Sequence, residues 1–239
     1  MNAIEIRHVK KAFGKTEILT DIDMIVQKQT IFGLLGPSGA GKTTLVKMIA
    51  GIQNPTAGSI IVNQTMMPSF AMMEKIGYMA QSDALYSELS ALENLDFFAS
   101  LYGLKGKKKK ERIHAVLEIV NLADHAKKTV SSYSGGMKRR LSLAAALLHE
   151  PEILILDEPT VGIDPVLRAS IWRELRCLRQ NGTTILVTTH VMDEAEKCDQ
   201  LAMMREGRLI STGTPEDLKD GSKTLEEAFL YFGGASNEN

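Results

Sequence analysis

Nine residues near the N-terminus constrain this chain more than any other stretch, and they read GPSGAGKTT. The pattern G-x-x-x-x-G-K-[ST] is typical of a phosphate-binding loop, in which glycines let successive backbone amides point at an anion. Its lysine would reach the β- and γ-phosphates of a nucleotide, and the next hydroxyl would ligate Mg²⁺. The residues of the predicted loop are Gly36, Pro37, Ser38, Gly39, Ala40, Gly41, Lys42, Thr43 and Thr44.

The residues on either side of this loop support the same interpretation. Residues 31–35 (IFGLL) are typical of a short buried strand, and residues 44–50 (TLVKMIA) are typical of a helix. A phosphate-binding loop needs a strand before it and a helix after it. We therefore expect a strand–loop–helix unit that binds nucleotide phosphates.

The composition limits the class of protein. The chain has 239 residues, 44% of them hydrophobic and 24% charged, which is ordinary for a globular protein. A formal net charge of −1 gives no electrostatic footprint for nucleic acid. Cys177 and Cys198 form no ligand or disulfide pattern, which favours a reducing cytosol. With no apolar run near 18 residues and no signal peptide, we expect a chain that does not cross a membrane by itself.

Two alternating stretches at the N-terminus predict an antiparallel sheet. Apolar or half-buried positions alternate with polar ones at Ile4, Ile6, His8 and at Ile22, Met24, Val26. Phe13 lies in the loop between the two stretches. A lone loop aromatic often serves local packing, but one upstream of a phosphate-binding loop could stack on adenine. Both interpretations stay open at this point.

The middle of the chain predicts an inserted helical segment. Residues 85–148 have a helical pattern without a convincing strand, and a methionine-rich stretch at 66–79 precedes them. We expect the methionines to fill the core. The basic run 105–112 fits a solvated helix start, with anionic lipid headgroups as the alternative. Ser134 could cap a helix over 141–149, leaving the amides of Gly135 and Gly136 as a second anion site.

Polar side chains follow two further buried strands. Residues 153–156 (ILIL) run into Asp157 and Glu158, and carboxylates are costly at the end of a buried strand unless they have a role. A Mg²⁺ role fits Asp157, and a helix-cap role is the alternative. His190 follows a strand over 183–188, at the strand end where ligands bind in parallel sheets. Asp164 and Pro165 begin a helix as N-cap and first residue.

In their order and spacing, these motifs closely resemble those of the ATP-binding subunits of ABC transporters, over almost the whole chain. The residues that carry the resemblance correspond to that family's Walker A loop (36–43), Q-loop (Gln81), signature motif (Ser134, Gly135, Gly136), Walker B strand with Asp157, catalytic glutamate (Glu158), D-loop (Asp164), switch histidine (His190) and adenine-stacking position (Phe13). The resemblance implies an α/β fold: a phosphate-loop NTPase core with a parallel sheet, an N-terminal antiparallel β-subdomain and an inserted helical subdomain. We expect a single domain over 1–239, with the helical subdomain at about 82–148.

The sequence departs from the family pattern at a few positions. Tyr133 and Met137 flank Ser134–Gly136 where leucine and glutamine are usual, and Met137 cannot hydrogen-bond as glutamine does. Phe13 replaces the commoner tyrosine, which preserves stacking. This signature, the stretch 162–165 and the tail 225–230 are most similar to the branch that serves drug, lipid or polysaccharide exporters.

The resemblance also implies a mechanism and partners. Two copies, or this chain and a paralogue, would pair head to tail, with each ATP between residues 36–43 of one subunit and 134–136 of the other. Glu158 would act as general base on water and His190 would steady the γ-phosphate. Thr43, Gln81 and Asp157 would hold Mg²⁺ and the water. The dimer would drive a separate transmembrane permease subunit from the cytoplasmic face of the cell membrane.

Other functions fit the sequence less well. ABC-type ATPases of DNA repair or translation bring coiled coils, tandem cassettes or basic extensions, and none is visible. A regulatory module without turnover is disfavoured by Glu158 and His190 together, and GTP use by the absence of an Asn-Lys-x-Asp stretch. An importer subunit remains the main alternative to an exporter subunit.

Overall fold

The computed structural model describes residues 1–219 and 221–232, which divide into two compact units. The first unit contains residues 1–73 together with the chain from Thr184 onward, and the second contains residues 74–183. The mixed architecture of parallel strands, an N-terminal antiparallel sheet and a helical insertion confirms the expected fold class. Compact units are not the same as independent domains, so the single domain expected over 1–239 stays a prediction.

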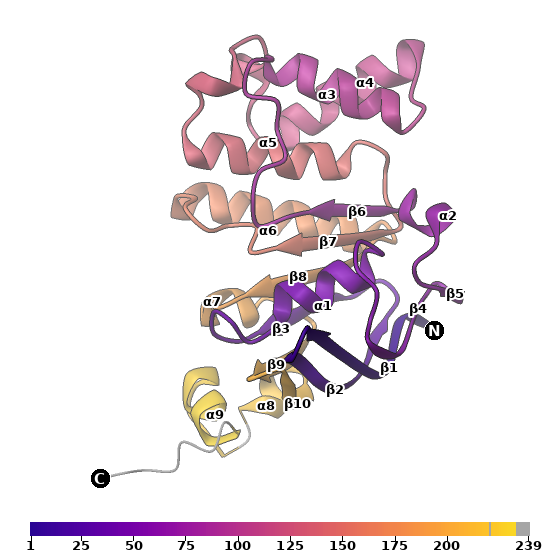
Figure 1. Ribbon diagram of the computed structural model, residues 1–239. Coiled ribbons are helices and arrows are strands. Elements are labelled where there is room, and N and C mark those ends of the chain that lie inside the picture. The colour runs from indigo at the N-terminus through magenta and orange to yellow at the C-terminus, as the bar shows by residue number, and fades with distance from the viewer. Residues whose placement is uncertain (220, 233–239) are drawn as a thin grey trace. The chain divides into compact units, whose positions relative to one another are not determined.

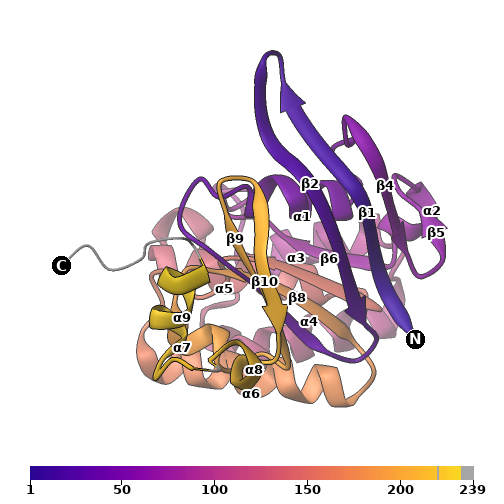
Figure 2. The same cartoon turned by 90° about the horizontal axis from the view of Figure 1, so that it is seen from below.

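The first unit begins with the expected antiparallel sheet, whose strand order is β2-β1-β4-β5. Figure 2 shows the long β1–β2 hairpin with β4 beside β1. The strands of this sheet are β1 (Asn2–Phe13), β2 (Thr16–Gln27), β4 (Ala57–Val62) and β5 (Thr65–Met66). The inward positions predicted from alternation are buried, with one exception.

That exception is His8, which the alternation placed on the same face as Ile4 and Ile6. The register shifts between Ile6 and Val9, so Val9 takes the buried position and His8 is exposed with a positive φ of 49°. The expected inward position of His8 is therefore wrong. A β-bulge inserts one extra residue and moves every later side chain to the other face.

A second sheet of the first unit carries the phosphate-binding loop. β3 lies between β8 and β9 and is parallel to both. β10 pairs with β9 in the antiparallel direction. Every residue of β3 and β8 is buried, which agrees with the apolar sequence of β3 and the apolar centre of β8. The bounds are β3 (Ile31–Leu35), β8 (Thr184–Thr189), β9 (Gln200–Arg205) and β10 (Arg208–Gly213). Five helices complete the described part of this unit, namely α1 (Lys42–Ile49), α2 (Phe70–Met73), α7 (Met192–Ala195), α8 (Pro215–Leu218) and α9 (Leu225–Phe232).

The second unit joins a pair of parallel strands to the helical insertion. β6 (Ile76–Met79) pairs with β7 (Ile153–Asp157), from Ile76 opposite Ile153 to Met79 opposite Leu156. The helices are α3 (Ala91–Leu101), α4 (Gly106–Ile119), η1 (Ala123–His125), η2 (Val130–Ser132), α5 (Gly135–Leu147) and α6 (Pro165–Gln180). Figure 1 shows α3, α4 and α5 lying together. The helix expected over 141–149 begins earlier, at Gly135, because Ser134 already supplies its cap.

Arginines bind the ends of the insertion's helices to one another. Arg112 of α4 donates hydrogen bonds to the carbonyls of Leu147 and Leu148 at the end of α5 (2.8 and 3.2 Å). Arg140 of α5 donates in return to the carbonyls of Val120 and Asn121 at the end of α4 (3.0 and 2.8 Å). These guanidinium groups satisfy carbonyls that a helix end leaves without intrahelical donors. The basic run 105–112 forms the start of α4 and most of its residues are exposed, which agrees with both the solvated-helix and the lipid-headgroup interpretations.

The methionine-rich stretch behaves as core filling at three positions, since Met67, Met72 and Met79 are buried. Within the described residues, no helix combines the length and apolar character that a bilayer crossing requires.

Candidate functional site

The predicted phosphate-binding loop lies between the end of β3 and the start of α1, as the sequence indicated. The amide of Gly36 donates to the carbonyl of Thr189 on β8 (3.3 Å), which fixes the start of the loop against the neighbouring strand. A Cβ atom on Gly36 would lie 2.3 Å from the carbonyl oxygen of Met204 on β9. The first glycine of the pattern is therefore required by a close backbone approach.

Lys42 is folded back over this loop. Its Nζ donates to the carbonyls of Gly36 (2.6 Å) and Pro37 (3.0 Å), and the residue is buried. Lys42 is also the first residue of α1, and Thr43 and Thr44 follow it in the first turn. The first amides of an α-helix have no intrahelical acceptor and carry the positive end of its dipole. The loop thus presents an ammonium group and helix amides in one place, which suits a phosphate.

The turn between β9 and β10 supports the loop from the other side. The amide of Gly207 donates to the carbonyl of Ala40 (3.2 Å), and the Gly207 carbonyl accepts from the amide of Thr20 on β2 (3.1 Å). No sequence motif pointed to Gly207 as a support of this loop. Its supporting contact is made between backbones about 170 positions apart, and no residue pattern signals such a contact.

The expected loop position of Phe13 is wrong, because β1 extends to this residue and pairs it with Thr16 of β2. The side chain of Phe13 is 49% exposed, and the Nζ of Lys11 lies 4.9 Å from the ring centroid. The same Nζ donates to the carbonyl of Asn54 (2.6 Å), so the lysine is tethered beside the ring. The exposed ring is compatible with stacking on a base, which stays a prediction.

His190 follows β8 directly and is exposed. A buried hydrogen-bond pair fastens the backbone beside it. The hydroxyl of Thr189 donates to Oε2 of Glu194 (2.8 Å) and accepts from the amide of Val191 (3.0 Å). Glu194 was not singled out from the sequence, because an acid in a short helix gives no hint of its partner.

In the second unit, Gln81 and Glu158 are brought together. Asp157 ends β7 with its side chain fully buried, and Glu158 follows it. The Nε2 of Gln81 donates to Oε2 of Glu158 (3.3 Å). Glu158 has a φ of 52°, in the left-handed region that residues with a side chain rarely adopt. Tyr78, on the neighbouring strand β6, has its pKa raised to about 12, mainly by burial and further by the charge of Asp157.

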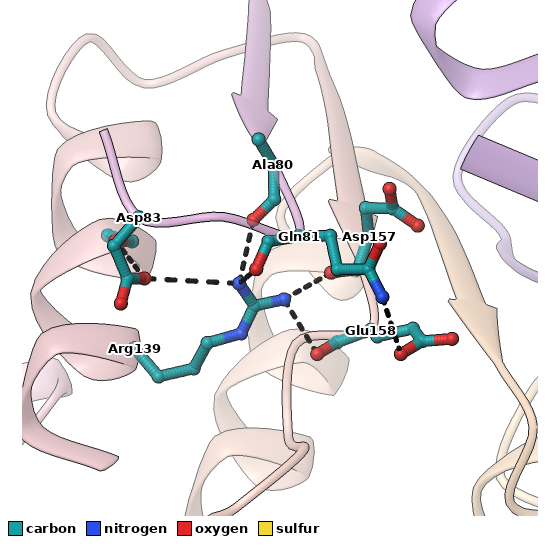
Figure 3. Close-up of polar contacts among 7 residues, drawn as sticks. Ala80, Gln81, Asp83, Arg139, Asp157 and Glu158 are labelled. Carbon is teal, nitrogen blue, oxygen red and sulfur yellow. Dashed lines mark hydrogen bonds and ion pairs between the residues drawn. The ribbon is translucent and has the colours of Figure 1, made fainter. Parts of the chain in front are cut away.

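Arg139 of α5 lies at the centre of this group (Figure 3). Its Nη1 donates to the carbonyls of Ala80 (2.7 Å) and Gln81 (2.8 Å), and its Nη2 donates to the carbonyls of Asp157 and Glu158 (the latter at 2.7 Å). Burial lowers the pKa of this guanidinium, while the nearby carboxylates, first that of Asp83, act in the opposite direction. No sequence motif singled out Arg139.

The signature residues form the start of α5. The Oγ of Ser134 accepts from the amide of Met137 (3.2 Å), as the predicted cap requires, and Ser134 and Gly135 are exposed. A Cβ atom on Gly136 would lie 3.3 Å from the carbonyl oxygen of Gly162, so this motif is adjacent to the segment before Asp164. The Oδ1 of Asp164 accepts from the amide of Leu167 (3.0 Å) and caps α6, as predicted.

Residues 19–161 match the ABC transporter family. The chain is 41% identical over 238 residues to the probable multidrug ABC transporter ATP-binding protein YbhF of Escherichia coli (strain K12), covering 96% of this chain and 41% of that protein. It thus spans less than half the length of that relative. It is also 41% identical over 231 residues to the Nod factor export ATP-binding protein I of Cupriavidus pinatubonensis, covering 95% of this chain and 71% of that protein.

A solved structure described as an ATP-binding subunit of an ABC transporter has the same fold. Its TM-score is 0.89 at 26% identity, over 97% of this chain and 99% of the other. The motifs of both units, the family match and these relatives lead to one conclusion: the chain belongs to the ABC transporter family and is similar to exporter-type ATP-binding proteins of that family.

Proposed function

We propose that this chain binds and hydrolyses MgATP as the nucleotide-binding subunit of an exporter. In the proposed assembly, two such subunits, either two copies or this chain and a paralogue, pair head to tail. Each ATP contacts residues 36–43 of one subunit and 134–136 of the other. A separate transmembrane permease uses the closing and reopening of the pair, with the subunits on the cytoplasmic face of the membrane.

The observation that carries the hydrolytic role is the pair formed by Gln81 and Glu158. A general base must be held within hydrogen-bond reach of the water that it activates. The 3.3 Å contact from Gln81 Nε2 holds the Glu158 carboxylate in place beside a side chain that can itself bind water. Glu158 would take the proton from the attacking water, and Gln81 would orient that water.

The phosphates would be held by the first unit. The amides of residues 39–44 and the Lys42 ammonium supply positive charge, and His190 would donate to the γ-phosphate as negative charge develops there. Lys42 would exchange its bonds to the carbonyls of Gly36 and Pro37 for bonds to phosphate oxygens. Phe13 would stack on the adenine ring, using the half of its surface that is exposed.

The residues proposed for Mg²⁺ offer oxygen donors only, namely the Thr43 hydroxyl, the Gln81 amide oxygen and the Asp157 carboxylate. This donor set suits a hard cation such as Mg²⁺, which prefers oxygen ligands. When bound, the ion would neutralise charge on the β- and γ-phosphates.

The signature region supports the paired arrangement. Ser134 and Gly135 are exposed at the positive end of α5, where an anion is stabilised by helix amides. Val161 and Val166 flank Asp164 and are exposed as well, so a second subunit would cover apolar surface there. The names of the relatives, which include multidrug and Nod factor export proteins, favour an exporter over an importer.

The test is Glu158→Gln, which keeps the shape of the side chain and removes its basicity. This variant should bind MgATP with the affinity of the wild type, lose nearly all turnover and accumulate as an ATP-bound dimer. Turnover is measured as phosphate release, and the dimer by light scattering with and without ATP. Near-normal single-turnover hydrolysis would remove Glu158 from the role of base.

A further inference from the structure

Arg139 connects three segments of the second unit that carry different parts of the proposed site. We propose that Arg139 is a positioning residue for hydrolysis, which holds Gln81 and Glu158 in their working arrangement through backbone carbonyls. The inference rests on the proposed function of Glu158 as the base. Arg139 itself need not contact ATP or water.

The first step is geometric. The pairing of β6 with β7 ends at Met79 and Leu156. The segments that follow the two strands must nevertheless stay side by side, because Gln81 contacts Glu158. Arg139 lies at that point, with Nη1 on the carbonyls that follow β6 and Nη2 on those of Asp157 and Glu158 (Figure 3). A guanidinium is planar and its donors are fixed relative to one another, so it sets the spacing of the two segments.

The second step concerns the backbone of Glu158. Its left-handed conformation, at φ 52°, persists only where surrounding contacts impose it. The bond from Nη2 of Arg139 to the Glu158 carbonyl (2.7 Å) is one such contact. If this bond is lost, the residue can relax to an ordinary conformation, which swings its carboxylate away from Gln81.

The third step is the position of Arg139 on α5. It follows Ser134–Gly136 by about one turn of the same helix, and it is only 6% exposed. In the proposed head-to-tail pair, Ser134–Gly136 contact the nucleotide held by the other subunit, whereas Glu158 acts on the nucleotide of its own. Within one chain, Arg139 therefore connects the segment that contacts the other subunit's nucleotide to the segment that acts on the chain's own nucleotide.

The test compares Arg139→Lys and Arg139→Gln with the wild type. Lysine keeps the charge but has one nitrogen, which cannot hold both pairs of carbonyls, so we expect kcat to fall about 100-fold, the loss typical of a misplacement of about 1 Å. KM for ATP should stay within about threefold, because the phosphate-binding loop is unchanged. Glutamine should lower kcat further.

The matched control is Arg112→Gln. Arg112 also donates to two carbonyls at the end of a helix in the same unit, but these belong to Leu147 and Leu148, and its ion pair is with Glu150 (3.5 Å). This variant should lose stability and keep kcat. The fluorescence of Trp172, the single tryptophan, which is fully buried in α6, reports whether each variant has folded.

Two measurements separate positioning from general damage. In a Glu158→Gln background, Arg139→Lys should cause no further loss of turnover, since a residue that acts by holding the Glu158 carboxylate beside Gln81 has no base left to position. Hydrogen exchange of the peptides around 80–83 and 157–161 should speed up at least about tenfold in Arg139→Gln and not in Arg112→Gln.

Unchanged exchange in those peptides, or a kcat within twofold of wild type in Arg139→Lys, would overturn the inference. So would an equal fractional loss of turnover in the Glu158→Gln background. If Glu158→Gln itself hydrolyses ATP normally, the proposed function fails instead, and the exchange experiment still tells whether Arg139 holds these two segments.

Discussion

Gly36→Ala is a small change that the structure predicts to be severe. The added Cβ atom would lie 2.3 Å from the carbonyl oxygen of Met204 and 3.2 Å from its carbonyl carbon. Ordinary contact begins at 3.4 Å, so the start of the loop and β9 must separate by about 1 Å. Both atoms belong to backbone inside a hydrogen-bonded sheet, and neither can rotate away as a side chain could.

Two effects of different size should follow. Overpacking of this kind costs about 1–3 kcal/mol of stability. The displaced amides should weaken binding and turnover of ATP far more, by about 100-fold, as is typical when binding groups move by about 1 Å. Urea denaturation measures the first effect, and titration with a fluorescent ATP analogue together with phosphate release measures the second.

The control is Gly103→Ala, in the residue that follows the C-cap of α3. Gly103 has a φ of 71°, and among the described residues no heavy atom lies within 4 Å of its would-be Cβ. Only backbone strain is therefore expected, about 1 kcal/mol, with normal nucleotide binding. If Gly36→Ala binds the analogue as tightly as the wild type, the close approach to Met204 does not position the loop, and the reasoning is refuted.

Two further changes test other parts of the chain. Phe13→Ala should weaken ATP binding by about 1–3 kcal/mol if the ring stacks on adenine, and should leave tripolyphosphate binding unchanged; equal losses for both ligands in a calorimetric titration would mean ordinary packing. His149 stacks on Tyr102 at 3.8 Å, and burial lowers the pKa of His149 to about 4. Because the unfolded chain takes up this proton near pH 6.5, stability should fall as the pH drops from about 6.5 to about 4. His149→Phe should reduce that fall, and urea midpoints at pH 7 and pH 4.5 that change equally in both proteins would contradict the assignment.

The parts of the fold that were predicted correctly depend on neighbours in sequence. The strand–loop–helix around Gly36–Thr44 is such a case, because the buried run, the glycines and the helix pattern are contiguous. The caps at Ser134 and Asp164 are another, since a cap and the amide that it accepts from are three residues apart. His8 shows that even a local pattern can mislead. The register shift between Ile6 and Val9 changes which face of the strand each later side chain occupies, and nothing in the residue types signals it.

The supports of the site could not be read from the sequence for a physical reason. Arg139 donates to four backbone carbonyls, and the amide of Gly207 donates to another. Every residue before the C-terminal one carries such a carbonyl. A donor that binds a backbone carbonyl does not require a particular residue type as its partner. Such a contact therefore leaves no motif in the sequence. Side chains proposed to contact ATP or Mg²⁺ are confined to a few chemical types, and the sequence indicates such positions directly.

The left-handed backbone at Glu158 also affects how this protein can be engineered. For a residue with a β-carbon, the left-handed conformation costs about 1 kcal/mol or more of stability, whereas glycine adopts it without this cost. Selection for thermal tolerance alone would therefore favour glycine or asparagine at this position and discard the carboxylate. A variant library ranked by melting temperature would therefore be enriched in inactive proteins at this position. Efforts to raise the thermal stability should keep Glu158 and seek stabilising substitutions elsewhere in the chain.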